Sequence, residues 1–262
     1  MNEREKLETV RARIDAVDAE LLRLIDERAG LAQAVRDIKR GGGEALPRLP
    51  IRSAREAQLL RTLLAARKTA SREVVLRVWR ELIAESIRIQ SPLQIALWGG
   101  KTPARTVELA RQWFGVAPAI VMVDEAEKAL AAAKRPGWLA VMTVEPGNRW
   151  WGRLLAEPSL NIFAALPCLT GWGPQSAFAV GAVEVEPSGL DETYWVTDAT
   201  ESAGQVESAL SGDGVAVHLI SEAGGLKLFG LAGYFERDDP RLARAPGRLS
   251  GVIGAAPAPF DL

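Results

Sequence analysis

Apolar residues recur along the first forty positions in alternating steps of three and four. They are Leu7, Val10, Ile14, Val17, Leu21, Leu24, Leu31, Val35 and Ile38. This spacing places them on one face of an α-helix, so a single helix is predicted from about Arg4 to Arg40. Gly41, Gly42 and Gly43 follow and end it, because glycine favours the C-cap conformation and disfavours the helix interior. A helix of this length measures about 54 Å.

Two shorter helices are predicted after the glycines. One begins at Ser53, where Ser53-Ala54-Arg55-Glu56 has the form of a capping box, and runs to about Lys68. The other begins after Ser71 and runs to about Gln90. Two short helices cannot cover the long apolar stripe of the first helix. We therefore expect an antiparallel second copy of the chain to cover it in a dimer.

Polar residues interrupt the apolar stripe of the first helix. The heptad series that starts at Leu7 reaches Arg28, and a cation in an apolar seam must meet an anion or reach solvent. Lys39 lies on the same face, about 16 Å further along the helix, so the two residues could bracket one small anion. Arg11 edges this stripe about 42 Å from Lys39. It can reach the same site only from an antiparallel partner chain.

The last of the three helices shows a similar interruption. Its stripe of Val75, Val78, Leu82 and Ile89 also contains Ser86, and Gln90 lies one turn beyond Ser86. Polar groups directed into a helical core cost free energy unless they bind each other or a ligand. Each has an ordinary interpretation too, since arginines snorkel, Glu56 can simply complete its capping box, and Ser86 and Gln90 can bond backbone carbonyls. Their combination favours a site for an anionic ligand.

A different pattern begins near residues 91–93. Short apolar runs then alternate with Gly, Pro and Trp, which predicts an α/β region. Expected strands lie at 94–98, 120–123 and 138–144, and expected helices at 106–114 and 125–134. The Gly-Lys-Thr at 100–102 does not indicate a phosphate loop, because that motif needs glycine where Ile95 stands.

Composition narrows the function classes. Lys and Arg number 32 against 33 acidic residues, so neither nucleic acid nor membrane is an expected partner. The charged N-terminus lacks the apolar core of a secretory signal, and no apolar run approaches the roughly 18 residues that span a bilayer, so a cytoplasmic location is expected. Cys168 is the single cysteine and cannot form an internal disulfide. His218 is the single histidine and cannot build a zinc cluster. We interpret both as packing residues. No metal is expected.

Three segments carry a resemblance to a known family. The stretch LETVRARIDAVDAELLRLIDERAGLAQAVRDIK, with AREAQLL and ELIAESIRIQ, resembles the all-helical (type II) chorismate mutases. It is most similar to the mutase domain of the bifunctional chorismate mutase–prephenate dehydratases, from about Leu7 to Gln90. The resemblance implies an all-α domain of three helices, residues 1–92, in an intertwined homodimer. It also implies conversion of chorismate to prephenate, without a cofactor, in aromatic amino-acid biosynthesis.

The same resemblance implies which residues bind the substrate carboxylates. Arg28 and Arg55 would hold one carboxylate or its neighbouring charge, and Arg11 of the second chain would hold another. Ser86 would line the carboxylate pocket. The chain departs from the family at Arg52, where an acidic residue usually stands three positions before the Arg of the RE pair.

The resemblance assigns the remaining roles to three residues. Lys39 and Gln90 would donate hydrogen bonds to the ether oxygen whose bond breaks, and Glu56 would accept one from the ring hydroxyl. Because the Claisen rearrangement is pericyclic, catalysis consists of holding the reactive conformer and stabilising charge on the ether oxygen. No nucleophile or proton relay is required.

The second half resembles the rest of the bifunctional family in a reduced form. Residues 93–186 are similar to a shortened dehydratase, with the opening strand at Ile95–Gly100 and the V-P-I-E-N segment at Val141–Asn148. The Thr-Arg-Phe signature falls on Ser176-Ala177-Phe178, without its Thr or Arg, so no dehydratase activity is expected.

Residues 187–262 resemble a regulatory ACT module with a βαββαβ order. Feedback by an aromatic amino acid is compatible with this resemblance, and so is a structural or partner-docking remnant. For the whole chain, the alternative to an active mutase is a non-catalytic regulatory or interaction protein that retains the mutase fold.

Overall fold

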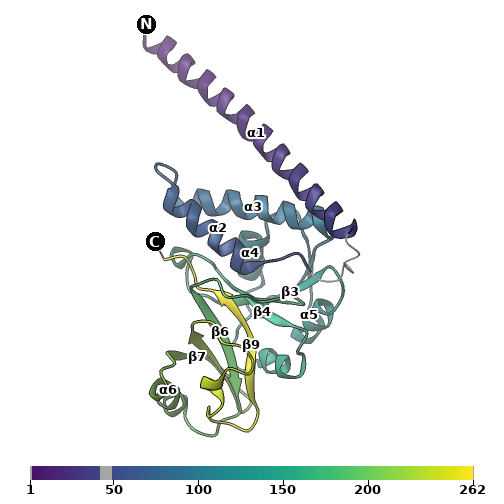
Figure 1. Cartoon of the computed structure of the whole chain (residues 1–262), viewed down its shortest axis with the longest axis vertical. Helices are drawn as coiled ribbons and strands as arrows, with labels where there is room; N and C mark the ends of the chain where they lie inside the picture. Colours follow the sequence, from purple (N-terminus) through teal and green to yellow (C-terminus); the bar gives the residue numbers. More distant parts are fainter. Residues whose placement is uncertain (1, 42–48, 262) are drawn as a thin grey trace.

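The first helix stands apart from the rest of the chain. The computed structural model describes residues 2–41 and 49–261. Helix α1 (Glu3–Gly41) projects from the body of the molecule, and only its C-terminal part contacts the other helices (Figure 1). This confirms the predicted single long helix. Of the three glycines expected to end it, Gly41 is the last helical residue, and Gly42 and Gly43 lie outside the described residues.

Helices α2 (Ser53–Ala66) and α3 (Arg72–Gln90) pack against each other beneath α1. Ser71 caps α3, because its side chain accepts a hydrogen bond from the backbone N–H of Val74. The capping box predicted at Ser53 is wrong by one position. Arg52 occupies the N-cap and makes no side-chain cap, while Ser53 is buried inside the first turn.

The remainder forms one curled, nine-stranded sheet in the order β2-β1-β3-β5-β4-β9-β6-β8-β7. The strands are β1 (Gln94–Trp98), β2 (Ala119–Met122), β3 (Trp138–Thr143), β4 (Asn161–Leu166), β5 (Ala177–Gly181), β6 (Asp191–Thr197), β7 (Val217–Ala223), β8 (Leu226–Ala232) and β9 (Ser250–Pro257). Strands β2, β1 and β3 are parallel, and most other pairs are antiparallel. Because β4 pairs with β9, the sheet is continuous across residues 186–187.

Helices α4 (Pro103–Phe114) and α5 (Ala126–Ala133) cover opposite faces of the first strands. Leu97 and Val141 point to the α4 side, whereas Ala96 and Met142 point to the α5 side, as alternation along a strand requires. Further helices are α6 (Ala203–Gly212) and the 3₁₀ turns η1 (Trp150–Ala156), η2 (Thr170–Trp172) and η3 (Pro240–Leu242). The strands and helices expected between residues 94 and 144 are all present within two or three residues of their predicted ends.

Helices α2 and α3 share a hydrophobic core with this sheet. Leu60 of α2 and Leu76 of α3 belong to the same buried cluster as Phe114 of α4 and Leu166 of β4. The face of α3 that is buried is therefore Leu76, Arg80, Ile83, Ala84 and Ile87. This corrects the predicted core stripe of α3, of which only Val75 is buried, because the second half covers the neighbouring face.

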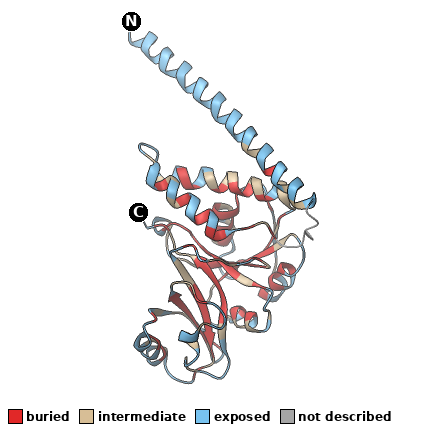
Figure 2. Ribbon diagram, in the orientation of Figure 1, coloured by how far each residue is buried: buried red, intermediate tan, exposed pale blue. Residues whose placement is uncertain are grey.

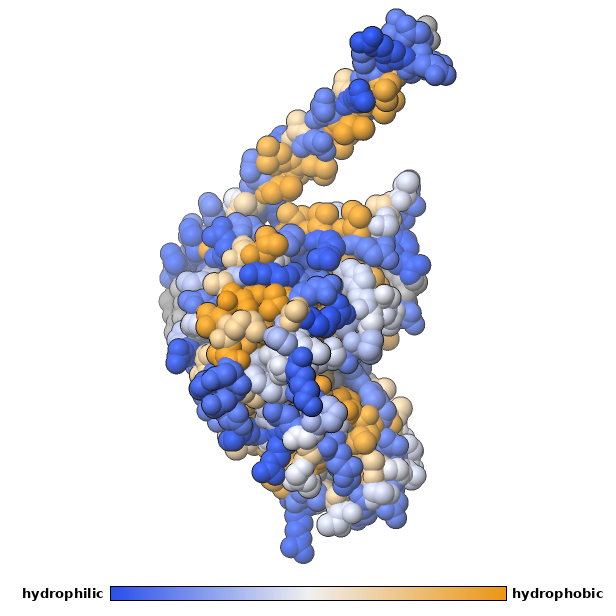
Figure 3. All heavy atoms as spheres, turned by 180° about the vertical axis from the view of Figure 1, so that it is seen from behind, coloured by the Kyte–Doolittle hydropathy of each residue, from blue (hydrophilic) through white to orange (hydrophobic). Residues whose placement is uncertain are grey.

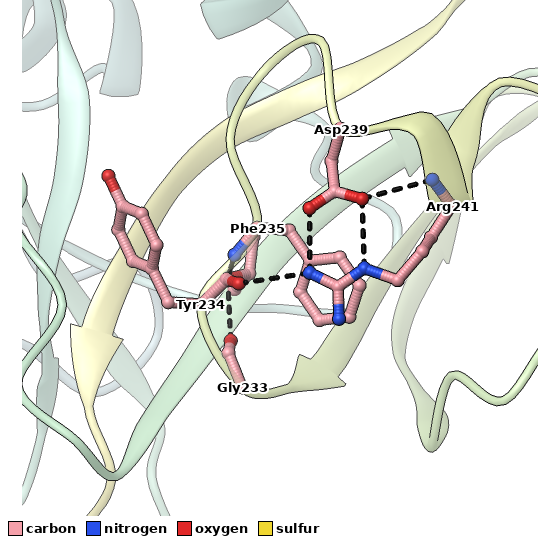
Figure 4. A network of polar contacts seen from close by, with 6 residues as sticks. Gly233, Tyr234, Phe235, Asp239 and Arg241 are labelled. Carbon is pink, nitrogen blue, oxygen red and sulfur yellow. Dashed lines mark hydrogen bonds and ion pairs between the residues drawn. The ribbon is translucent and has the colours of Figure 1, made fainter.

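The C-terminal part departs from the expected βαββαβ order. Strands β6, β7, β8 and β9 and helix α6 are present, but the second helix is replaced by the three-residue turn η3. Pro240, Pro246 and Gly247 interrupt this stretch, so it cannot sustain a regular helix. The connection is held instead by Asp239, which binds the Arg241 guanidinium (shortest distance 2.6 Å) while that group stacks over the Phe235 ring (Figure 4).

Candidate active site

A cavity of about 420 Å³ lies where the C-terminal part of α1 meets α2 and α3. Its walls include six of the residues proposed from the sequence: Arg28, Lys39, Arg55, Glu56, Ser86 and Gln90. They come from three helices and are separated by as many as 62 positions (90 − 28) in the chain. The structure therefore places close together six residues that were proposed from helix periodicity and from the family resemblance.

Arg28 is anchored to α3 at the edge of the cavity. Its Nη1 donates to the Ser86 hydroxyl at 2.6 Å and to the backbone carbonyl of Leu82. The Ser86 hydroxyl in turn donates to the same Leu82 carbonyl at 2.9 Å. Partial burial lowers the pKa of Arg28, but arginine remains charged at any physiological pH. The remaining guanidinium N–H groups can donate to an anion.

Lys39 and Gln90 form a second polar group in the same wall. The Lys39 ammonium donates to Gln90 Oε1 at 3.3 Å, and Gln90 Nε2 donates to the backbone carbonyl of Ser86 at 3.0 Å. An ammonium carries three hydrogens and an amide nitrogen two. Each group therefore keeps at least one donor for a ligand atom in the cavity.

Among the described residues that line the cavity, Glu56 is the one carboxylate, and it is buried. Its Oε2 accepts a hydrogen bond from Arg80 Nη1 at 3.0 Å, and its Oε1 accepts one from the backbone N–H of Arg52 at 3.4 Å. Burial raises the pKa of Glu56, and the attraction of Arg80 opposes that rise without cancelling it. The neighbouring guanidinium is thus the main group that favours the ionised carboxylate.

Arg52 and Arg55 complete the wall from α2. Arg55 is exposed, so its guanidinium is accessible to a ligand. Arg52, which stands where the family usually has an acid, binds Glu186 of the second half with Nη2–Oε distances of 3.0 and 3.3 Å. The described lining therefore carries four cationic side chains, Arg28, Lys39, Arg52 and Arg55, against the single carboxylate of Glu56. That balance suits a ligand with two negative charges.

Arg11 is not near this cavity. It lies in the exposed part of α1, more than four helical turns before Arg28. The apolar stripe around it is also exposed (Figure 2), with 56% of Val10, 52% of Ile14 and 51% of Leu21 accessible. Figure 3 shows apolar side chains gathered along α1 and on the helical layer beneath it.

Two residues next to the site were missed by reasoning from the sequence. Arg80 lies outside the α3 stripe that the sequence suggested, and Glu186 lies in the connection between β5 and β6, for which no role was predicted. A signal for Arg80 existed, since it follows Leu76 at i+4 and precedes Ala84 and Ile87 on one helix face. The sequence does not show that the second half covers this face of α3, so the spacing alone could not identify Arg80 as a buried residue beside the site.

The residues that correspond to the dehydratase signature do not lie at the cavity between the three helices. Ser176, Ala177 and Phe178 line a separate cavity of about 630 Å³ together with Glu192 and His218. His218 Nε2 lies 3.2 Å from Glu192 Oε1, and 62% of the His218 side chain is exposed. His218 is therefore not the packing residue that we expected, whereas Cys168 is buried. Among the described residues no cluster of His, Cys, Asp or Glu could hold a metal, and no helix could span a membrane.

Comparison with known proteins gives a family match for the first part of the chain. Residues 10–91 match the family Chorismate mutase type II. Bifunctional chorismate mutase/prephenate dehydratases are similar in sequence: that of Pseudomonas aeruginosa is 33% identical over 141 residues, which cover 50% of this chain and 37% of the relative. That of Aquifex aeolicus is 30% identical over 117 residues, which cover 42% of this chain and 31% of the relative.

The matches leave most of each relative uncovered, since the chain spans at most 37% of their lengths. Among solved structures, prephenate dehydratase from Streptococcus mutans superposes with a TM-score of 0.40 and 12% identity over 63% of this chain and 97% of that one. The residues that line the cavity all lie within residues 10–91, the range that matches the family Chorismate mutase type II.

Proposed function

We propose that the chain is a chorismate mutase that converts chorismate to prephenate in the cytoplasm as part of aromatic amino-acid biosynthesis. The observation that carries the proposal is the cavity of about 420 Å³, into which three helices bring four cations, one carboxylate and the Ser86–Gln90 pair. Chorismate is a dicarboxylate with a ring hydroxyl and an ether bridge. The wall offers a partner of matching charge or polarity for each of these groups.

The cationic groups would hold the substrate in its compact conformer. In this proposal Arg28 and Arg55 bind one carboxylate, and Ser86 orients the Arg28 guanidinium through the bond of 2.6 Å. Fixing a flexible substrate in its reactive geometry is worth several orders of magnitude in rate for an intramolecular reaction. Glu56 would accept the hydrogen bond of the ring hydroxyl and so select one face of the ring.

Lys39 and Gln90 would act on the breaking bond. As the C–O bond lengthens, negative charge grows on the ether oxygen, and donors already in place stabilise it without reorganisation. The contact of 3.3 Å between the two side chains keeps both donors on one side of the cavity. No proton is transferred in a Claisen rearrangement, so these groups bind charge and neither gives up its hydrogen.

The proposal includes a homodimer with Arg11 acting in trans. The exposed apolar stripe of α1 supports it, because a face of this length in water would be covered by an equally long partner. An antiparallel second α1 would bring the partner's Arg11 toward the C-terminal part of this helix, where the cavity lies. Arg11 would then bind the second carboxylate.

The second half has separate proposals. We propose that residues 93–186 are a shortened dehydratase-like region without dehydratase activity, since Ser176 and Ala177 stand where that family has Thr and Arg. Residues 187–262 would form an ACT-like module, an idea supported by the antiparallel order β9-β6-β8-β7. An aromatic amino acid is the effector implied by the resemblance, and phenylalanine or tyrosine added to the mutase assay tests it.

The direct test is to incubate the purified full chain with chorismate and to identify the product by chromatography and NMR. We expect prephenate in an amount equal to the chorismate consumed, at a rate proportional to protein. A folded protein that leaves chorismate at the uncatalysed rate would favour the alternative, a regulatory protein that keeps the mutase fold.

A further inference from the structure

Arg80 is a buried cation outside the cavity. Its side chain is 2% exposed, and it lies on the face of α3 that packs against the second half. It does not line the cavity. A fully buried arginine is unfavourable unless its charge and its N–H groups find partners, and the partners of Arg80 come from both halves of the chain.

The first partner is the active-site carboxylate. Arg80 Nη1 donates to Oε2 of Glu56 at 3.0 Å, and Glu56 lines the cavity whereas Arg80 does not. The second partner is an aromatic face, because the Arg80 guanidinium carbon lies 3.6 Å from the centre of the Trp113 ring on α4. Trp113 is itself buried in the core shared by the helices and the sheet. The Cys168 thiol, next to β4, also faces Arg80.

We propose that Arg80 is a positioning residue of the mutase site, which holds the Glu56 carboxylate in the cavity wall and is itself held in place by Trp113 of the second half. The inference rests on the proposed mutase function. It gives the α/β region a role in that reaction. Without the α4 face behind it, the guanidinium would have no fixed orientation from which to hold the carboxylate.

The charges around Glu56 support the same role for Arg80. Burial alone raises the pKa of Glu56, and Arg80 provides the largest opposing effect. The other charged groups around this carboxylate belong to α1 across the cavity and to α2 itself: Arg28, Lys39, Arg52 and Arg55. These four side chains are partly or fully exposed, and in the occupied cavity they would also pair with the substrate carboxylates. Arg80 is therefore the cation that keeps Glu56 an acceptor in both the empty and the occupied cavity.

The test compares pH profiles of kcat and kcat/KM for chorismate in the full chain. In Arg80→Gln, Glu56 should ionise only at higher pH, so the acid limb of the profile moves up by about one to three pH units. Near neutral pH we expect kcat to fall about 10- to 100-fold while KM changes less, because the substrate carboxylates keep their partners. Arg77→Gln is the matched control. It also removes an arginine that stacks on the second half, 5.5 Å from the centre of Trp172, and it should leave the limb unchanged.

Arg80→Lys keeps the charge and provides a second measurement in case Arg80→Gln does not fold. Lysine lacks the planar fork and stacks less well, so kcat should fall several-fold while the acid limb stays near that of the parent. Parent-like kcat and pH profile in either folded Arg80 variant would overturn the positioning role. An inactive parent would instead refute the proposed function, so the two failures are distinguishable.

Discussion

At the residue scale, the polar side chains of the cavity are held by partners that the structure defines. Ser86 connects Arg28 to α3, and Gln90 connects Lys39 to the same helix. The resemblance anticipated these four residues, because the mutase motifs cover them almost without change. It did not anticipate Arg80 or Glu186, since their partners lie on elements whose packing cannot be inferred from one helix's periodicity.

The first prediction concerns Lys39. Lys39→Ala removes a donor to the ether oxygen, and kcat/KM for chorismate should fall about 10²- to 10³-fold, as for other preorganised donors. The measurement is chorismate loss followed by absorbance. Arg23→Ala on the same helix removes an exposed cation that is paired only with Glu20 and Glu27, and it should change the rate less than twofold, within assay scatter. Equal losses in both variants would contradict the assignment.

The second prediction concerns pH. Glu56 is a stronger hydrogen-bond acceptor when ionised than when protonated, and burial raises its pKa, so the parent's activity should rise with pH through that pKa and then stay flat. The plateau follows because the amide of Gln90 does not titrate. In Gln90→Glu the new carboxyl donates only when protonated, so activity should instead fall as pH rises. A parent that loses activity from weakly acid to neutral pH would refute the role given to Gln90.

At the element scale, helix periodicity predicted the existence and approximate ends of α1, α2 and α3. It failed at the start of α2, where Arg52 takes the cap that Ser53 was expected to provide. It also failed on α3, because apolar residues lie on more than one face of this helix, and the face buried against the second half cannot be chosen from the sequence alone.

The cap of α3 gives an element-scale prediction. Ser71→Ala removes the acceptor for the Val74 N–H, and the free energy of unfolding should fall by about 0.5–2 kcal/mol. Thermal or urea unfolding followed by circular dichroism measures this. Ser208→Ala, in the interior of α6, removes a hydroxyl that only bonds the Gly204 carbonyl and should be nearly neutral. A loss in Ser208→Ala as large as that in Ser71→Ala would argue against a capping effect.

Helix α1 gives a second prediction at this scale. If each site takes Arg11 from the partner, Arg11→Ala and Arg28→Ala should each be nearly inactive, but unfolding and refolding them together should restore activity. Random pairing makes half of the dimers mixed, each with one intact site, so about a quarter of the parent's activity is expected. Recovery no greater than the sum of the separate variants would contradict a site built from two chains.

At the scale of the whole molecule, the two halves are joined more closely than their sequences suggest. Leu60 and Leu76 share one core with Phe114, and β4 pairs with β9 across the boundary expected at residues 186–187. Strand pairing between residues about ninety positions apart leaves no local pattern, so the continuous sheet could not be predicted. The first three strands, β1, β2 and β3, could be predicted, because their apolar runs are local.

A whole-molecule prediction concerns the dehydratase reaction, which we propose the second half does not perform. Since Ser176 and Ala177 replace the Thr and Arg of the dehydratase signature, purified protein given prephenate at neutral pH should form no phenylpyruvate above the spontaneous rate. The enol of phenylpyruvate in alkali is read by its absorbance. Formation in proportion to protein concentration would overturn this proposal and leave the mutase assignment untouched.

The central claim is that the cavity between α1, α2 and α3 rearranges chorismate. The most direct measurement is the initial rate of chorismate loss for the purified parent beside Arg28→Ala, both verified as folded by circular dichroism. We expect turnover by the parent and a rate lower by at least about 10²-fold in the variant, which loses the anchored cation of the cavity. Turnover that Arg28→Ala leaves unchanged would place the reaction elsewhere, and a folded parent without turnover would contradict the claim outright.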